Sequence, residues 1–285
     1  MPELVGTVQA ELEAAARRLA AGGVAEPTRE ALRLWAALTD SGPGEVWQER
    51  SAAAPADLAV RYQEAVGRVL AGEPFQYVVG STGFRRLVIR CDRRALIPRP
   101  ETEGLVDLAL ALAPAGRALD LGTGTGCLAL ALADEGRYQS VTAVDRSPEA
   151  LDLARLNGSL SRLAVRWLEG DWCAPVEGEQ FDLVVTNPPY ITGEEVDRLE
   201  PGVRDWEPRS ALDGGPDGLR DVARLLRDTA LVLRPGGWLL MELDSTRAQV
   251  AADLARGLGW TTVRVHDDLF GRPRYLVARR ESNDA

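Results

Sequence analysis

The fold of this chain is decided by residues 117–136, RALDLGTGTGCLALALADEG. Residues 117–122 form a short apolar run that is typical of a buried strand, and residues 127–136 have the leucine and alanine content of a buried helix. The loop between them carries glycine at every second position, 122, 124 and 126. A strand, a glycine-rich turn and a helix in this order predict the first unit of a layered α/β fold.

The same alternation continues toward the C-terminus. Further strands are predicted at 140–146, 164–171, 181–186 and 237–243, and further helices at 148–161, 218–233 and 246–258. Strict alternation predicts an α/β fold with a doubly wound, mostly parallel sheet. Two last strands, 261–268 and 275–280, have no helix between them. We therefore expect the sheet to end in a C-terminal antiparallel hairpin.

The N-terminal part has a different pattern. Residues 1–72 contain three amphipathic segments, which predict a small helical domain. The first has Val5, Val8, Leu12, Ala16 and Leu19 on one face and stops at two glycines. Residues 73–100 contain two short β-rich runs around a glycine-containing turn, which predict a β-hairpin connector. The expected organisation is a helical domain at 1–72, a connector at 73–100 and an α/β domain at 101–285.

Charge and composition narrow the classes of partner. The chain has 285 residues and a net charge of −10. Proteins that grip nucleic acid through its phosphates need a basic face, so we expect no direct nucleic-acid partner. No apolar run approaches the roughly 20 residues of a membrane helix, and the first residues lack the pattern of a secretory signal. We therefore expect a cytoplasmic protein without membrane contact. We also expect a monomer.

Cysteine and histidine are scarce. The three cysteines, Cys91, Cys127 and Cys173, are far apart in the sequence, and His266 is the only histidine. This spacing argues against a disulfide framework and a structural zinc site. We expect no metal, and we expect His266 to be an ordinary residue of a late strand.

The glycine-rich loop is a candidate cofactor site. Glycine allows a tight turn and a close approach of the backbone to a ligand in front of a helix N-terminus. Asp145 ends the next strand about 20 residues later, where a carboxylate can accept hydrogen bonds from both ribose hydroxyls. Trp172, after the third strand, either lies near an adenine or only packs. This pattern predicts a nucleoside-containing cofactor. The candidate residues are Gly122, Thr123, Gly124, Thr125, Gly126, Asp145 and Trp172.

A second candidate site follows the strand at 181–186. It consists of Asn187, Pro188, Pro189 and Tyr190. Prolines cannot donate to a sheet, so strand pairing ends there, and the residue before each proline is held extended. The side-chain oxygen of Asn187 and the carbonyl of Pro188 form a fixed pair of acceptors, with Tyr190 as an aromatic wall. Two acceptors suit an NH₂ group, which has two hydrogens.

These motifs together resemble a known family. An N-P-P-Y sequence after the fourth strand and a glycine-rich first loop are similar to S-adenosylmethionine-dependent methyltransferases that act on planar NH₂ groups. Further segments resemble the peptide chain release factor glutamine N5-methyltransferases, the PrmC/HemK family. They are ALIPRPETE (95–103), AVDRSPEAL (143–151), VRDWEPRSALDGGPDGL (203–219) and DLFGRPR (268–274).

The resemblance implies a Rossmann-like methyltransferase domain with S-adenosylmethionine as cofactor. It implies cofactor contacts from residues 122–126, Asp145, Trp172 and Asn187, and a glutamine held by residues 187–190. It gives Asn187, Pro188 and Tyr190 the catalytic roles. It further implies that release factors are the protein substrates and that their methylation modulates translation termination. Residues 191–216 would face the substrate.

The chain departs from the family pattern at Gly83, where an acidic residue usually precedes the phenylalanine, and at Asp244, where the family tends to have glycine. Three other functions stay open. The N-P-P-Y sequence is also found in nucleic-acid adenine N6-methyltransferases, and the glycine-rich loop alone would allow a nicotinamide-linked oxidoreductase. A non-catalytic S-adenosylmethionine-binding interaction protein would use the helical domain instead.

Overall fold

A computed structural model of the chain describes residues 4–281. The predicted domain ranges also include residues 1–3 and 282–285, which lie outside the described residues. The chain divides into two compact units. One contains the described residues up to Gly80 together with Pro201–Trp206, and the other contains Ser81–Glu200 and the described residues from Glu207 onward.

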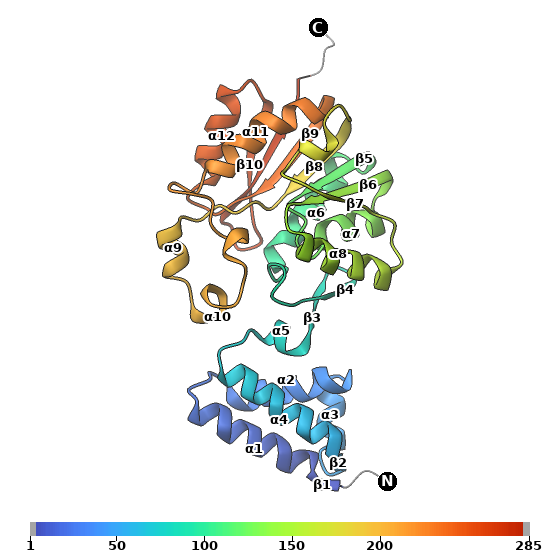
Figure 1. Ribbon diagram of the computed structural model, residues 1–285, viewed down its shortest axis with the longest axis vertical. Coiled ribbons are helices and arrows are strands. Elements are labelled where there is room, and N and C mark those ends of the chain that lie inside the picture. The colour runs from blue at the N-terminus through green and yellow to red at the C-terminus, as the bar shows by residue number, and fades with distance from the viewer. Residues whose placement is uncertain (1–3, 282–285) are drawn as a thin grey trace. The chain divides into compact units, whose positions relative to one another are not determined.

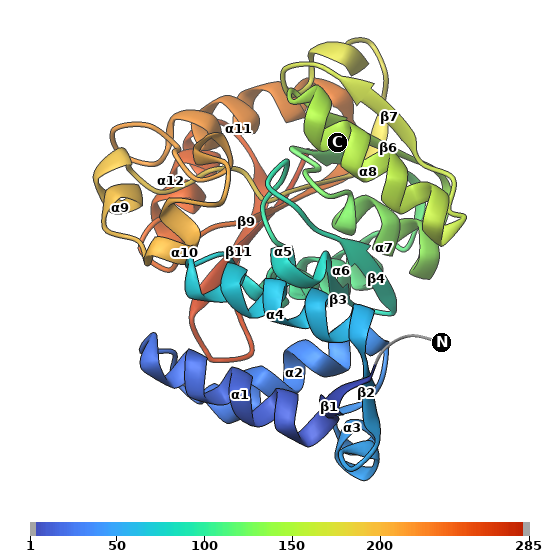
Figure 2. The same cartoon turned by 60° about the horizontal axis from the view of Figure 1, so that its bottom comes forward.

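The first unit is mainly helical, as the amphipathic segments predict. Its core is formed by apolar side chains of the helices, and it includes an edge-to-face pair of Trp35 and Tyr62 with ring centroids 4.9 Å apart. The buried Tyr62 hydroxyl donates to the Ala31 carbonyl at 2.9 Å, so its polar end is satisfied. The elements are β1 (Leu4–Thr7), α1 (Val8–Ala21), α2 (Pro27–Thr39), α3 (Pro43–Glu49), β2 (Ala53–Pro55), α4 (Ala56–Leu70) and α5 (Phe75–Val79) (Figure 2).

The first helix begins later than the sequence pattern suggests. Residues Leu4–Thr7 form a short strand that pairs with Ala53–Pro55, so Val5 belongs to a strand and not to the helix. Thr7 ends this strand and caps the helix, because its hydroxyl accepts a hydrogen bond from the backbone N–H of Ala10 at 3.2 Å. The helical periodicity of residues 3–8 was therefore outweighed by a cap and a strand pairing.

The predicted connector is also partly wrong. Its first β-rich run, Phe75–Val79, is a short helix, which begins after Pro74 and ends at Gly80 with a left-handed φ of 77°. The hairpin lies further on, where β3 (Ser81–Phe84) pairs with β4 (Leu87–Arg90). Its turn therefore falls at residues 85–86 and not at the predicted glycine. The flanking proline and glycine fixed a helical turn in a segment whose residue types favour a strand.

The second unit is built on a mixed sheet. Within the described residues, seven strands lie in the order β10-β11-β9-β8-β5-β6-β7. The pairs among β9, β8, β5, β6 and β7 are parallel, whereas β11 is antiparallel to both β9 and β10. The predicted doubly wound sheet and its C-terminal antiparallel hairpin are confirmed. The strands are β5 (Ala115–Leu121), β6 (Arg137–Asp145), β7 (Arg166–Glu169), β8 (Phe181–Thr186), β9 (Leu233–Glu242), β10 (Thr261–Asp267) and β11 (Pro273–Arg279).

Helices cover both faces of this sheet (Figure 1). On one side lie α6 (Glu103–Leu112), α7 (Cys127–Glu135) and α8 (Pro148–Ser161). On the other lie α11 (Arg220–Val232) and α12 (Ala248–Gly257), whose apolar residues form one buried cluster with β8, β9 and β11. The sheet is therefore buried on both faces, which explains why Phe181–Thr186 is buried throughout and reads as a continuous apolar run.

Short elements fill the connections of the second unit. They are η1 (Pro100–Thr102), η2 (Ala174–Val176), α9 (Gly193–Asp197) and η3 (Arg209–Ala211). The element α10 (Pro201–Arg204) falls in the segment that belongs to the first unit. Among residues 4–281, no helix is both long and apolar enough to cross a bilayer.

Candidate active site

The glycine-rich loop joins β5 to α7 at the carboxyl edge of the sheet. Gly122 and Gly126 both have left-handed backbones, with φ of 70° and 83°. A side chain would also lack space at either position. A Cβ on Gly122 would lie 3.1 Å from the ring of Trp172, and one on Gly126 would lie 3.0 Å from the ring of Trp167. Glycine is needed here for both backbone conformation and close packing.

A buried carboxyl supports this loop from below. Asp120 is fully buried at the end of β5 and accepts hydrogen bonds from the Thr123 hydroxyl at 2.6 Å and the Ala129 N–H at 3.2 Å. Both bonds go to one oxygen, and the other oxygen, Oδ1, has no hydrogen-bond partner. Burial raises the pKa of Asp120 to about 7, because it disfavours the charged form. This residue ties the loop to the first turn of α7.

Asp145 links the loop to the next strand. One carboxylate oxygen accepts from the Gly124 N–H at 2.8 Å, and the other accepts from the Ser147 N–H at 2.9 Å. The side chain is half-buried, and each oxygen keeps a further lone pair. Asp145 can therefore hold the loop in shape and still accept hydrogen bonds from a ligand hydroxyl.

Trp172 forms a wall beside the loop. It is 8% exposed and has a left-handed φ of 53°, which is uncommon for a large side chain. Its ring packs in the cluster beneath α11 and α12 and also lies against Gly122. Trp172 thus packs in the core and also lines a cavity, so core packing and a place beside an adenine are compatible.

The N-P-P-Y sequence begins directly after β8. Asn187 is half-buried, and its side-chain nitrogen donates to the Thr102 hydroxyl at 3.3 Å. Pro188 and Pro189 are buried. Tyr190 packs against the large core cluster, and burial raises the pKa of its hydroxyl well above the usual range. The tyrosine is therefore a fixed support at this end of the strand.

Glu207 anchors the segment that precedes η1. Its buried carboxylate accepts from the Ile97 N–H at 3.2 Å and pairs with Arg99 at 2.6 Å. Burial raises the pKa of Glu207, and the Arg99 guanidinium opposes this shift. The two segments that resemble the family most specifically, 95–103 and 203–219, thus bind each other.

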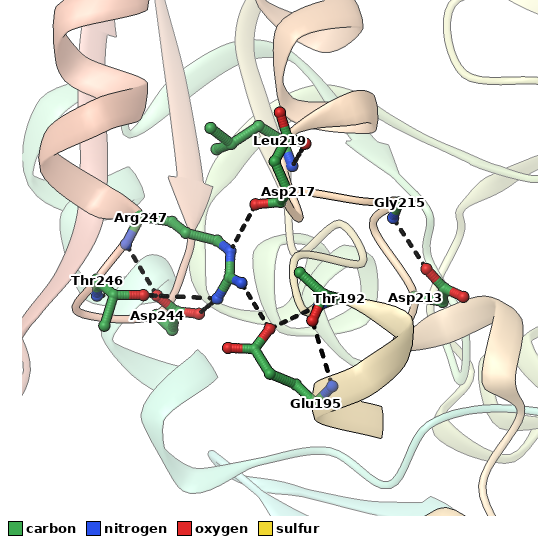
Figure 3. Close-up of polar contacts among 9 residues, drawn as sticks. All are labelled: Thr192, Glu195, Asp213, Gly215, Asp217, Leu219, Asp244, Thr246 and Arg247. Carbon is green, nitrogen blue, oxygen red and sulfur yellow. Dashed lines mark hydrogen bonds and ion pairs between the residues drawn. The ribbon is translucent and has the colours of Figure 1, made fainter. Parts of the chain in front are cut away.

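The segment after Tyr190 is held by Arg247, at the start of α12 (Figure 3). Its guanidinium pairs with Glu195 at 2.6 Å and with Asp244, and it donates to the Asp217 carbonyl at 3.1 Å. Glu195 also closes a capping box with Thr192 at the start of α9. Arg247 is 8% exposed, so its charge is compensated by these partners and not by water.

Two further sets of contacts hold this segment and the start of α12 in place. Asp244, at the position where the family tends to have glycine, accepts from the backbone N–H groups of Thr246 and Arg247 at 2.8 and 2.9 Å. Gly214 and Gly218 lie so close to Pro189 and Tyr190 that a Cβ would come within 2.6 Å and 2.2 Å of their carbonyl oxygens. The loop is therefore packed directly on the N-P-P-Y backbone.

These elements surround one cavity of about 400 Å³. This volume is in the range of small-molecule sites, about 300–1,000 Å³. Ala95, Leu128 and Ala150 supply apolar wall, while Asp145 and Asn187 supply polar groups. The cradle in front of Gly122, the lone pairs of Asp145 and the apolar wall suit a cofactor with a ribose and a flat base. The residues present therefore fit a nucleoside-containing cofactor.

Most of the sequence-predicted residues meet at this cavity. It is lined by Gly122, Thr123, Gly124, Thr125, Asp145, Trp172, Asn187 and Pro189. Gly126, Pro188 and Tyr190 are not among its lining residues. Gly126 is the N-cap of α7, and Pro188 and Tyr190 follow the end of β8. The sequence patterns indicate no role for Thr102, Glu207 or Glu242, although Thr102 and Glu207 lie in segments that carry the family resemblance. Their partners are far away in the sequence, so no local spacing could reveal them. No cluster of metal-ligating side chains occurs among residues 4–281, and the three cysteines are buried thiols.

Comparisons with known proteins agree with this geometry. Residues 11–80 match the PrmC N-terminal domain, and residues 103–199 match the methyltransferase small domain. A release factor glutamine methyltransferase of Moorella thermoacetica is 41% identical over 96% of this chain and 99% of its own length. One of Cereibacter sphaeroides is 41% identical over 94% and 96%.

The chain belongs to the release factor glutamine methyltransferase family. This confirms the family that the sequence motifs predict. A solved methyltransferase of Pyrococcus furiosus has the same fold, with a TM-score of 0.53 and 21% identity over 79% of this chain and 98% of that one. A 16S rRNA methyltransferase of T. thermophilus, solved with AdoMet and guanosine, has a TM-score of 0.50 and 20% identity. It covers 71% of this chain and 50% of that chain. These likenesses concern the fold of the sheet domain.

Proposed function

We propose that this chain transfers a methyl group from S-adenosylmethionine to the side-chain amide nitrogen of a glutamine in peptide chain release factors. The observation that carries this proposal is that Asn187 and Pro189 line the same cavity as Gly122 and Asp145. One of the two predicted acceptors for an NH₂ group, the Asn187 side chain, thus shares one space with a pocket for a nucleoside cofactor. Pro188, which supplies the other acceptor, lies between Asn187 and Pro189 in the chain. Family membership over nearly the whole chain supports the same activity.

When bound, S-adenosylmethionine supplies a methyl group on a positively charged sulfur. Asp145 and the loop at 122–125 would hold its nucleoside part, with Trp172 as a wall. Asn187 would accept one hydrogen of the substrate amide through its side-chain oxygen, and the Pro188 carbonyl would accept the other. Two acceptors raise the electron density on the amide nitrogen and restrict its orientation. The residues of this site thus contribute positioning and electrostatics, and no nucleophilic side chain is required.

The protein substrate supplies the remaining specificity. We propose that the helical domain, which the sequence analysis bounds at 1–72, recognises the release factor, since all candidate cofactor residues lie beyond residue 118. Deleting residues 1–72 should leave affinity for S-adenosylhomocysteine within a few-fold, while methylation of intact release factor collapses. An equal loss of both in a fragment that still melts cooperatively would contradict this role. We further propose that the chain acts as a monomer in the cytoplasm, without nucleic acid.

The decisive experiment is methyl transfer from labelled S-adenosylmethionine to a purified release factor. We expect label on the wild-type release factor and none on a variant whose acceptor glutamine is replaced by alanine. Labelling of DNA or RNA would favour the adenine methyltransferase instead. Calorimetric binding of NAD in place of S-adenosylhomocysteine would favour the oxidoreductase. Cofactor binding without transfer to any of these substrates would favour the non-catalytic binding protein.

A further inference from the structure

The Asn187 amide has two chemically different ends, and its orientation decides what it offers to a ligand. The oxygen is an acceptor and the nitrogen carries two donors. In the structure, the nitrogen donates to the Thr102 hydroxyl at 3.3 Å, which leaves the oxygen for the cavity side. A hydroxyl can donate or accept, so this arrangement holds only if Thr102 directs its own proton elsewhere.

Glu242 is the group that can accept a hydrogen bond from the Thr102 hydroxyl. It ends β9, and the parallel register of Thr186 with Met241 brings the next residues, Asn187 and Glu242, to the same level of the sheet. The Glu242 side chain is a hydrogen-bond partner of the Thr102 side chain. Glu242 is 1% exposed, Thr102 is 3% exposed, and the second carboxyl oxygen of Glu242 has no partner. Water therefore does not compete at this position.

The turn that carries Thr102 is fixed by β11. The Tyr275 hydroxyl donates to the Glu101 carbonyl at 2.5 Å, and Tyr275 is the register partner of Glu242. At the next turn, a Cβ on Gly104 would lie 2.3 Å from the Tyr275 hydroxyl oxygen, so only glycine allows this approach. The ends of β8 and β9 thus supply the two partners of the Thr102 hydroxyl, Asn187 and Glu242, and β11 fixes the turn that carries Thr102.

We propose that Thr102 and Glu242 are positioning residues that set the polarity of the Asn187 amide. The ionised Glu242 carboxylate accepts a hydrogen bond from the Thr102 hydroxyl, so the Thr102 oxygen is left to accept from the Asn187 nitrogen. The Asn187 oxygen then faces the substrate. The proposal rests on the proposed function, because only an NH₂ substrate needs an acceptor there. Neither Thr102 nor Glu242 needs to touch the substrate.

We call the hydrogen bonds that run from Glu242 through Thr102 to Asn187 the relay. The relay has a defined response to protonation of Glu242. When Glu242 is protonated on the oxygen that faces Thr102, it donates to the Thr102 hydroxyl. Thr102 then loses this acceptor, and turning its own proton toward Asn187 attracts the amide oxygen. The amide nitrogen would then face the cavity, where a donor cannot hold an NH₂ group. Burial raises the pKa of Glu242 to about 7, so this change falls near neutral pH. The charged and titratable groups around Glu242 are Arg274, Glu101, Arg99, Tyr190 and Tyr275.

The experiment compares Thr102→Val, which removes the hydroxyl, with Thr102→Ser, which keeps it. Thr229→Val is the matched control, because Thr229 is also buried and its hydroxyl donates only to a helix carbonyl. With saturating cofactor, Thr102→Val should lower the single-turnover rate about 5- to 150-fold, the usual effect of an unmade buried hydrogen bond. The KM for release factor and the affinity for S-adenosylhomocysteine should stay within a few-fold. Thr102→Ser should restore the rate, and Thr229→Val should leave it unchanged.

Two further readouts separate this relay from a merely structural role. The wild-type rate should rise with pH around 7, and Thr102→Val and Glu242→Gln should lose this limb. The second readout needs no activity. In the cofactor-free protein, the NMR signals of the Asn187 NH₂ group, assigned by their loss in Asn187→Ala, should shift with pH around 7 and respond to Thr102→Val. The relay is overturned if these signals do not respond, or if wild type and Thr102→Val methylate with equal rate and pH profile. Absence of methylation by the wild type would instead count against the proposed function.

Discussion

The two halves of the cavity are constructed in different ways. In the cofactor half, the shape comes mainly from the backbone, since Gly122 and Gly126 make the turns and Asp145 closes them through backbone N–H groups. All of these residues lie within one β-α-β stretch. In the acceptor half, the shape comes from side chains of distant segments, because Asn187 depends on Thr102 and through it on Glu242.

This difference predicts how each half responds to substitution. In the cofactor half, the Asp145 side chain that closes the backbone turns also faces the cofactor, so its loss should weaken the turns and the binding together. In the acceptor half, removal of a single hydrogen-bonding side-chain group should abolish the contact to the substrate, although the prolines keep the backbone in place. Substitution of Asn187 in the acceptor half should therefore affect turnover and spare cofactor binding and stability, whereas substitution of Asp145 in the cofactor half should affect binding and stability together.

The largest effect is expected for Asn187→Ala. It removes one preorganised polar contact to the substrate, which typically costs about 10²- to 10³-fold in rate. Thermal stability should change little, because Pro188 and Pro189 still fix the strand end and Thr102 keeps Glu242 as a partner. Single-turnover methylation of release factor with saturating cofactor, together with a thermal melt, measures both quantities. A near wild-type rate would reduce N-P-P-Y to a strand terminator.

A smaller effect is expected for Asp145→Ala. Ribose hydroxyls without their acceptor cost about 1–3 kcal/mol, or roughly 5- to 150-fold in affinity for S-adenosylhomocysteine. Because the Gly124 and Ser147 N–H groups also lose their acceptor, the melting temperature should fall as well. Titration calorimetry and a thermal melt check the two effects. Asp152→Ala is the control, since Asp152 forms an exposed ion pair with Arg155 on α8 and is not among the residues that line the cavity.

Two outcomes would contradict this assignment of Asp145. An unchanged dissociation constant with a lowered melting temperature would make Asp145 a loop anchor that does not contact the cofactor. A weakened affinity that Asp152→Ala reproduces would point to the overall charge of this edge of the sheet.

The difference between the halves also explains what the sequence could predict. The sheet, its hairpin and the cofactor loop follow from local patterns, since the strand, the glycines and Asp145 are near neighbours in the chain. The relay does not, because the Thr102 hydroxyl and Asn187 meet only through the packing of α6 against the sheet. Where the sequence predicts the wrong local element, the reason is itself local. The helix at Phe75–Val79 was missed because Pro74 and Gly80 outweighed the strand preference of its residues.

The two halves share one feature, and it leads to the last prediction. Each contains a fully buried carboxyl with one unpartnered oxygen, Asp120 in the cofactor half and Glu242 in the acceptor half. Burial raises the pKa of both to about 7, whereas an unfolded chain ionises them near pH 4. Between these values the folded protein holds protons that the unfolded chain releases.

The stability that these carboxyls contribute is therefore complete below about pH 4 and is lost as the pH rises through 7. We expect the free energy of unfolding to fall between pH 5 and pH 7.5, by at most about 1.4 kcal/mol per pH unit for each group. Asp120→Asn and Glu242→Gln should each flatten this slope, and the double variant should flatten it most, because neither amide titrates. Urea unfolding at a series of pH values measures the slope directly. A wild-type stability that rises across this window, or a double variant with the wild-type slope, would show that both carboxyls are already ionised in the folded protein.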